Sequence, residues 1–204
     1  SGRYCVGMTD RAFLAGLLAA LCACVPAQAA YFSVAGDEVR LQGSIETGDV
    51  ERMESLLAER RPAPLRVLRL HSPGGNLREG IRLADLVRKH RLATIVDARS
   101  AYCDSACTLL FVAGVRRHYV GAERLAEGSE ALYGLGFHLA STRGDRANPS
   151  MKSAEGERLM AGLYARMGTP RATDLARRAA INTLWRPNGA TALRLGVATS
   201  LSPP

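Results

Sequence analysis

Leu70-His71-Ser72-Pro73-Gly74-Gly75 is the stretch that decides the fold. It closes an alternation of apolar residues and arginines over 65–70 that predicts a strand, and the proline keeps the residue before it extended. The glycine pair makes a sharp exit, after which Asn76 can cap a helix that begins at Leu77. Another short strand is expected at 93–96. A strand, a helix and a strand in this order form a crossover, which implies parallel strands.

Cys103-Asp104-Ser105-Ala106-Cys107 is the second informative stretch, because it predicts a turn that opens a helix over 106–114. A serine on a sharp turn at a helix N-terminus suits nucleophilic catalysis, since the N–H of the next residue, Ala106, points at a developing oxyanion. The helix dipole favours the same negative charge. The alternative is that Ser105 only caps the helix.

Two further features could complete such a site. Gly74 and Gly75 can present unblocked N–H groups to a carbonyl oxygen, although a tight turn that needs positive φ also explains a glycine pair. His138 follows an expected strand over 131–137, and functional residues gather at strand ends in parallel sheets. His138 is therefore the candidate general base, and a hydrogen-bonded structural histidine is the alternative.

The other three histidines have weaker claims to catalysis. His90 is expected as a solvated residue at a helix end, His118 as a surface residue of an arginine-rich strand, and His71 as a strand residue facing solvent. A zinc site formed by the two cysteines with His118 and His138 is a further alternative. The cysteine spacing is wider than zinc motifs use and no second paired motif is present, so we expect neither a metal nor another cofactor.

The rest of the chain predicts strands and amphipathic helices within one α/β domain. Two strands surround the turn at Gly36-Asp37, and a helix that starts near Asp49 should end at Pro62. A charged loop is expected over 122–130. The two strands around the Gly36-Asp37 turn are expected at 31–35 and 39–45. The other expected elements are a strand at 117–120 and helices at 148–168, 170–180 and 189–195.

The composition is that of an ordinary folded domain with a sizeable core, with 204 residues of which 47% are hydrophobic and 23% charged. The net charge is +8, and the basic residues are arginines apart from Lys89 and Lys152. The arginines are scattered among acidic residues, without a basic block interleaved with aromatics. We therefore expect a solvated arginine-rich surface and no nucleic-acid partner.

Residues 1–29 predict a secretory signal peptide with an N-terminal extension. Met8 precedes a short charged region, residues 12–25 form an uninterrupted apolar run, and Ala27-Gln28-Ala29 is a small-x-small cleavage site. We expect export to the periplasm, with the membrane engaged only through this segment. The alternatives are an uncleaved anchor, for which the apolar run is short, and lipidation at Cys24.

Removal of residues 1–29 leaves two cysteines, Cys103 and Cys107, on either side of Ser105. In an oxidising compartment they can form a disulfide if the geometry permits it. The alternative is a pair of reduced, buried thiols. A disulfide would stiffen the turn that carries the serine.

Taken in order, these motifs resemble the Clp protease/crotonase superfamily, and more closely the exported bacterial proteins with a Clp protease proteolytic-subunit-like fold. The resemblance covers residues 39–199 and implies a single α/β domain over 30–204, built as a spiral of β-β-α units. Besides the two stretches quoted above, it rests on Gly43-Ser44-Ile45, Gly48-Asp49, Ala113-Gly114, Gly136-Phe137-His138 and Leu195-Gly196-Val197-Ala198-Thr199.

The resemblance implies a serine peptidase of the Ser–His–Asp type that acts on a peptide or protein substrate. Carried over to this chain, Ser105 is the nucleophile and His138 the general base. The implied oxyanion donors are Gly74, Gly75 and Ala106. Members of the superfamily commonly form trimers or rings, so a homo-oligomer is implied as well.

The third catalytic residue is the weak point of this assignment, because no aspartate stands at the family's position. Asn182 is the candidate there, beside Thr183, and Asp174 is a further one. An asparagine could orient His138 as in Cys–His–Asn sites. A Ser–Lys dyad would need Lys89 or Lys152, and neither occupies an obvious position.

Two other hypotheses for the function remain open. The first is a catalytically degenerate binding or assembly module that kept the fold, which the missing aspartate favours. The second is a crotonase-like acyl-thioester enzyme, which export disfavours because coenzyme A is an intracellular cofactor.

Overall fold

The computed structural model describes residues 29–128, 130–141, 152–180 and 182–204. The expected signal peptide therefore lies outside the described residues except for Ala29. The first residues of the helix expected at 148–168 lie outside them too. None of the helices in these described ranges has the length and hydropathy that a membrane span requires.

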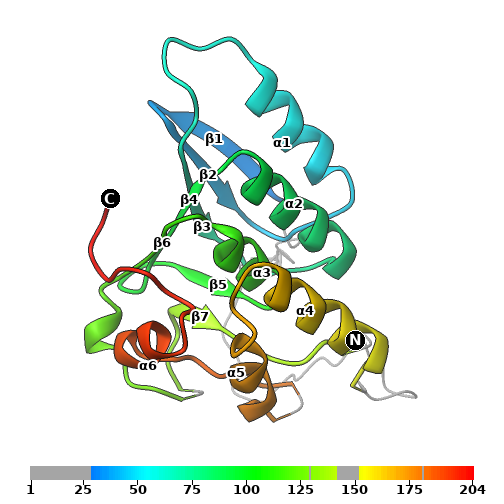
Figure 1. Ribbon diagram of the computed structural model, residues 1–204, viewed down its shortest axis with the longest axis vertical. Coiled ribbons are helices and arrows are strands. Elements are labelled where there is room, and N and C mark those ends of the chain that lie inside the picture. Colours follow the sequence, from blue (N-terminus) through cyan, green and yellow to red (C-terminus); the bar gives the residue numbers. More distant parts are fainter. Residues whose placement is uncertain (1–28, 129, 142–151, 181) are drawn as a thin grey trace, which may run out of the picture.

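A five-stranded sheet forms the upper part of the molecule in Figure 1. Its strand order is β1-β2-β3-β4-β6, in which β1 and β2 pair antiparallel and every other pair is parallel. Parallel neighbours follow from the crossover connections between β2, β3, β4 and β6, of which the sequence predicted the one between β3 and β4. The strands are β1 (Tyr31–Ala35), β2 (Glu38–Gln42), β3 (Val67–His71), β4 (Ala93–Asp97) and β6 (Arg117–Val120).

The apolar alternation of these strands selects the face that carries the helices. Leu68 and Leu70 of β3 are fully buried, whereas Arg69 between them is only half-buried. Three helices pack over the apolar side with their own apolar residues in the same core. They are α1 (Asp49–Ala58), α2 (Leu77–Lys89) and α3 (Ala106–Ala113). All eight residues of α3 are buried, which agrees with its predicted apolar composition.

A second, two-stranded parallel sheet consists of β5 (Tyr102–Asp104) and β7 (Gly134–Gly136). A β-bridge between Ser72 and Cys103 joins β5 to the chain just after β3. The sequence predicted a turn at 103–105 and no strand, because three residues are too short for an alternation to show. The strand expected over 131–137 is shorter than predicted, since only its last part pairs with β5.

The chain ends in three helices, α4 (Ala154–Arg166), α5 (Ala172–Arg178) and α6 (Gly189–Arg194), and a 3₁₀ turn, η1 (Ala122–Arg124), follows β6. Helix α4 packs against α2 and α3, where Tyr164 is among the largest fully buried side chains. Helices α5 and α6 lie below the second sheet in Figure 1. The predicted single-domain α/β architecture is confirmed.

Some local features of the structure agree with the sequence pattern and others differ from it. The Asn76 side chain accepts a hydrogen bond from the N–H of Glu79 and caps α2, as predicted. Helix α1 ends at Ala58 rather than reaching Pro62, because the backbone of Glu59 is extended, with φ −62° and ψ 137°. His118 is 5% exposed, and its Nδ1 lies 2.7 Å from the carbonyl oxygen of Ser202. The expected surface role for His118 is therefore wrong, because the chain after α6 covers β6.

Candidate active site at the ends of β3, β5 and β7

Ser105 occupies a strained turn between a strand and a helix. It follows β5 directly and is the N-cap of α3, with φ 54° and ψ −123°. A positive φ is uncommon for a residue with a side chain and costs about 1–3 kcal/mol, so such residues gather at functional sites. The side chain makes no capping hydrogen bond to α3. The alternative that Ser105 only caps the helix is therefore not what the structure shows.

The chain after β3 packs directly against this turn. A Cβ atom on Gly74 would lie 2.8 Å from Ser105 Cβ, 2.8 Å from Ala106 N and 2.5 Å from the carbonyl oxygen of Asp104. Gly74 also has φ 87°, so two independent constraints require glycine at this position. This close approach places the SPGG turn and the serine turn in contact.

Two backbone donors at this contact are free among the described residues, those of Gly75 and Ala106. Ala106 is the first residue of α3, where helical geometry leaves the N–H without an intrahelical acceptor. The neighbours of Gly75 pair with Ile45, which accepts from Asn76 and donates to Gly74, while the Gly75 N–H is left out of this bridge.

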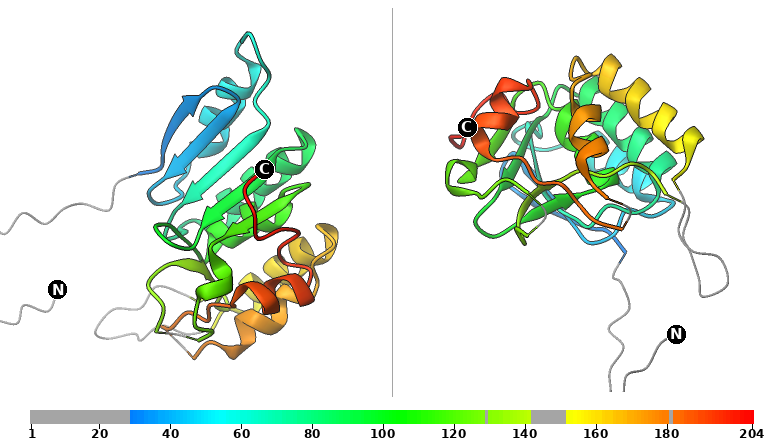
Figure 2. Two further views of the ribbon diagram at one scale, coloured as in Figure 1. Left: turned by 90° about the vertical axis from the view of Figure 1, so that its left-hand side faces the viewer. Right: turned by 90° about the horizontal axis from the view of Figure 1, so that it is seen from below.

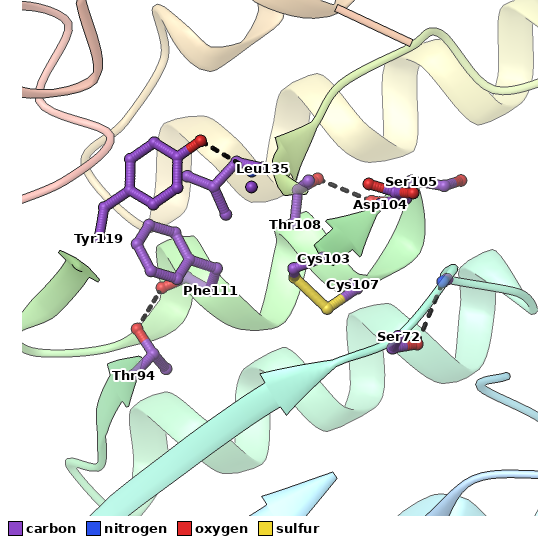
Figure 3. Close-up of a disulfide and its surroundings, with 12 residues drawn as sticks. Ser72, Thr94, Cys103, Asp104, Ser105, Cys107, Thr108, Phe111, Tyr119 and Leu135 are labelled. Carbon is purple, nitrogen blue, oxygen red and sulfur yellow. Dashed lines mark hydrogen bonds between the residues drawn. A yellow bond between two sulfur atoms is a disulfide. The ribbon is translucent and has the colours of Figure 1, made fainter. Parts of the chain in front are cut away.

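Gly74 does not fit the donor role expected for it. Its N–H donates to Ser72 Oγ at 3.1 Å, as the dashed line beside Ser72 in Figure 3 shows. Because Ser72 is fully buried, this hydrogen bond keeps the Gly74 N–H inside the turn. The candidate oxyanion donors are narrowed to Gly75 and Ala106.

A disulfide joins Cys103 to Cys107 beneath the serine turn (Figure 3). It links the middle of β5 to the first turn of α3, so Ser105 lies inside a loop closed by the bridge. Both cysteines are fully buried. The bridged state leaves neither sulfur as a zinc ligand, and the described residues hold no group of three or more His, Cys, Asp or Glu suited to a metal ion.

Thr108 supports the same turn from inside the helix. Its Oγ1 donates to the carbonyl of Ser105 at 2.7 Å and lies 3.0 Å from the hydroxyl of Tyr164 on α4. Burial raises the pKa of Tyr164 well above its ordinary value, so the hydroxyl stays protonated. The serine turn is thus anchored to α4 through a buried pair of hydroxyl groups.

His138 lies at the same edge of the second sheet as Ser105. In the parallel pairing of β5 with β7, Asp104 is opposite Gly136, and the Ser105 N–H donates to the Gly136 carbonyl at 2.8 Å. His138 comes two residues after Gly136. Among the described residues the Ser105 hydroxyl and the His138 ring make no direct hydrogen bond, a looser geometry that unliganded sites often show.

Burial lowers the pKa of His138, and a backbone hydrogen bond at Leu139 together with the negative charge of Asp104 opposes this effect. The net direction is downward, which keeps the imidazole neutral near pH 7. A neutral imidazole is the form that can accept a proton from serine.

Asn182 is exposed and lines one small cavity with His138 and Lys152. The structure thus brings Asn182 near the histidine, and no hydrogen bond joins the two side chains. Its backbone has φ 63°, the conformation that asparagine tolerates better than most residues. Asp174 lies exposed in the first turn of α5.

Asp104 is the residue of this region that sequence reasoning passed over. Its carboxylate is buried and receives two hydrogen bonds from Arg186, at 2.6 Å to Nη1 and 3.0 Å to Nη2. Burial raises the pKa of Asp104, and the hydrogen bonds and charge of Arg186 act against this rise. The signal available in the sequence was the acidic residue directly before Ser105, to which no role had been assigned.

His71, expected to face solvent, is instead half-buried. Its ring packs edge-on against Tyr102, with 4.4 Å between the centroids. Burial lowers its pKa, while the charge of Asp104 acts in the opposite direction. A cavity of about 490 Å³ between β1 and α1 includes none of the predicted site residues.

Comparison with solved structures identifies this arrangement of sheets and helices. The membrane-bound stomatin-specific protease 1510-N, in a mutant form, superposes with a TM-score of 0.57 over 80% of this chain and 77% of its own, at 14% identity. A mutant of ClpP1 from Listeria monocytogenes superposes with a TM-score of 0.52 over 82% of this chain and 92% of its own, at 16% identity. The chain has a Clp protease-like fold. No family model matches it, and no significant match was found among curated proteins.

The Clp protease-like fold accounts for the meeting of distant motifs at one edge. The parallel strands β3, β5 and β7 deliver, in turn, the glycine pair, Ser105 and His138 at their C-terminal ends. The chain thus has the Clp protease-like fold that the resemblance implied.

Proposed function

We propose that this chain is an exported serine hydrolase that cleaves peptide bonds, with Ser105 as nucleophile and His138 as general base. The observation that carries the proposal is the backbone of Ser105. A φ of 54° at the N-terminus of α3 holds the serine in a strained turn without a capping bond, beside two free N–H donors.

The proposed reaction follows from this arrangement. Ser105 Oγ attacks the carbonyl carbon of the scissile peptide bond while His138 takes its proton, which gives a tetrahedral intermediate. The N–H groups of Gly75 and Ala106 stabilise its oxyanion; removal of one such donor typically costs about 10²–10³ in rate. The C–N bond then breaks as His138 returns the proton to the leaving amine, and water hydrolyses the acyl-serine by the reverse proton path.

The orientation of His138 is assigned to Asn182 in this proposal. Both side chains line the same small cavity, and an asparagine can hold a catalytic imidazole in the required orientation. A peptide or protein is the proposed substrate. We expect the backbone around the SPGG turn to bind it. No metal or organic cofactor enters any step.

Export is supported by the sequence of residues 1–29 and by the disulfide, because disulfides persist in oxidising compartments such as the periplasm. Mass spectrometry of the protein recovered from a periplasmic extract should find an N-terminus at Ala30. Recovery of the whole chain from the cytoplasm would contradict export.

Turnover tests the proposed activity. The full chain, incubated with an unfolded, fluorescently quenched protein substrate, should release fluorescence, and Ser105→Ala should reduce the rate by at least 10³-fold while the protein stays folded. Thr108→Ser keeps the hydroxyl that supports the turn and serves as the matched control. Equal rates for Ser105→Ala and wild type would refute the proposal.

A second candidate function is a non-catalytic binding or assembly module. The exposed Asn182 and the missing Ser105–His138 hydrogen bond favour it. This module should bind the unfolded substrate with the same affinity in the wild type and in Ser105→Ala, and should cleave it in neither.

A further inference from the structure

The serine turn is tied to the rest of the second sheet by one buried ion pair. Asp104 immediately precedes Ser105, and its carboxylate is held by both terminal nitrogens of Arg186. Arg186 is 4% exposed, so the pair is shielded from water. A fork of this kind fixes direction as well as distance, which an exposed pair does not.

Arg186 also fixes the start of β7. Its Nε donates to the carbonyl of Ala131 at 2.7 Å, and its Nη1 donates to the carbonyl of Gly134 at 3.0 Å. The backbone of Arg186 pairs in both directions with Gly128, at 2.9 and 3.0 Å. One guanidinium therefore connects the end of β5, the start of β7 and the chain that follows α5.

The same chain segment holds the end of β7. Trp185 and Phe137 exchange two backbone hydrogen bonds, at 2.8 and 2.9 Å. Phe137 is fully buried and is followed by His138. The position of His138 is thereby set from Arg186 and Trp185, the segment that also holds Asp104.

Gly136 shows that the sheet is built around this pair. A Cβ atom at Gly136 would collide with Oδ1 of Asp104 and would lie 2.8 Å from Nη1 of Arg186. The backbone of Gly136 does not have a positive φ, so conformational freedom is not the reason for the glycine. The space that glycine leaves is filled by the ion pair.

We propose that Asp104 and Arg186 are positioning residues of the serine–histidine site: the buried pair locks β5 onto β7 and segment 185–186, so that Ser105 and His138 are held at one edge in fixed relation. The proposal rests on the proposed hydrolase function. It assigns no contact with substrate to either residue. In addition, the carboxylate supplies negative charge that acts on His138.

The charges around His138 allow this role to be measured. The negative charge of Asp104 favours the protonated forms of His138 and of His71, the last residue of β3. Arg186 opposes this charge, and Lys152 is the cation that lines the cavity beside His138. Removal of Asp104 should therefore lower the pKa of His138, and removal of Arg186 should raise it.

The experiment compares Asp104→Asn, Arg186→Gln and the wild type in the full chain by two measurements. The first is the rate of labelling of Ser105 by a fluorophosphonate, normalised to folded protein; the second is the titration midpoint of His138 by NMR. We expect labelling at least tenfold slower in both variants, with His138 midpoints that move down in Asp104→Asn and up in Arg186→Gln. Asp85→Asn, which breaks an exposed pair with Arg166, is the matched control and should change neither quantity.

Unchanged His138 midpoints in the folded variants would overturn the proposal, even with slower labelling, because general loosening explains slower labelling alone. If Asp104→Asn does not fold, the midpoint in Arg186→Gln decides. If the wild type is not labelled at all, the proposed hydrolase is refuted. This outcome is separate from the His138 midpoints, which test the positioning role of the pair. In that case the shifts still decide whether the pair acts on His138.

Discussion

The backbone N–H of Ser105 donates a hydrogen bond to the carbonyl of Gly136 at 2.8 Å. This bond continues the ladder between β5 and β7 by one step beyond the last strand residue, so the proposed nucleophile is fixed to the strand that leads to His138. Two residues that are 33 positions apart in the sequence, Ser105 and His138, thereby reach the same edge of the sheet. The relation depends on backbone pairing, which makes it insensitive to surface substitutions.

Gly74→Ala should abolish labelling by a fluorophosphonate and destabilise the protein. The new Cβ would meet Ser105, Ala106 and the Asp104 carbonyl at 2.5–2.8 Å, and alanine at φ 87° adds about 1–2 kcal/mol of backbone strain. Gly168→Ala is the control, because Gly168 has φ 77° with nothing within 4 Å of the added atom. Gly168→Ala adds backbone strain alone, whereas Gly74→Ala adds both strain and the close contact. Thermal unfolding and labelling rates of the two variants therefore separate these two effects. Equal behaviour of the two variants would show that the contact does not matter.

The disulfide should contribute measurably to stability. Loop-closure entropy for a bridge between residues four apart predicts about 2 kcal/mol. Replacing both Cys103 and Cys107 by alanine, or adding a reductant, should lower the melting temperature and slow labelling of Ser105, whose turn loses a constraint. Thermal scans with and without reductant provide the measurement. The melting temperature of the double alanine variant should not change when reductant is added. A change there would show that the reductant acts on something other than this disulfide.

Labelling should depend on pH through His138. Burial lowers the pKa of this imidazole below its ordinary value of 6.5, so the neutral form that accepts a proton persists to lower pH. The rate should rise with pH, reach half its maximum below pH 6.5 and stay flat above it. His138→Gln should remove the rise, whereas His90→Gln, at an exposed helix end, should keep it. A midpoint above pH 6.5 in the wild type would contradict the assignment.

The same depressed pKa implies a loss of stability in acid. The unfolded chain binds a proton at His138 more readily than the folded chain does, so the free energy of unfolding falls as pH drops through 6.5 toward the folded-state pKa. His71, whose pKa is also lowered, acts in the same direction. Histidine titrates over about pH 5 to pH 7. In chemical denaturation over this range, the free energy of unfolding should fall less with decreasing pH in the His71→Gln/His138→Gln double variant than in the wild type.

Breaking the Asp104–Arg186 pair should be costly to the fold. Removing one partner of a buried ion pair leaves the other charge without compensation, which typically costs about 3–5 kcal/mol. Arg186→Ala should approach this loss in urea denaturation. Arg177→Ala, which breaks an exposed pair with Glu157, should cost no more than about 1 kcal/mol. Similar losses in the two variants would mean that the buried pair does not hold the second sheet.

Most of the fold could be predicted from local signals because each signal has a local cause. The alternation around Leu68 and Leu70, the cap at Asn76 and the apolar composition of α3 all describe contacts that a residue makes with near neighbours or with a face. Strand β5 could not be predicted this way. Its three residues are a strand only because Ser72 and Gly136 lie on either side of it.

The site was predicted less completely than the fold. Ser105 and the glycine pair carry motif signals, and the structure places them in contact. The engagement of the Gly74 N–H by Ser72 and the burial of His118 under the last residues depend on tertiary packing that no local pattern encodes. Arg186 was missed for the same reason: one arginine among many in the sequence becomes distinctive only when Asp104 is seen beside it.

Identification of the residue modified by a fluorophosphonate tests the central claim most directly. The full, oxidised chain is treated with the probe, digested and analysed by mass spectrometry, with Ser105→Ala treated in parallel. The account predicts one adduct on Ser105 in the wild type and none in the variant. An unmodified Ser105 in folded protein, or an adduct that persists in Ser105→Ala, would contradict it.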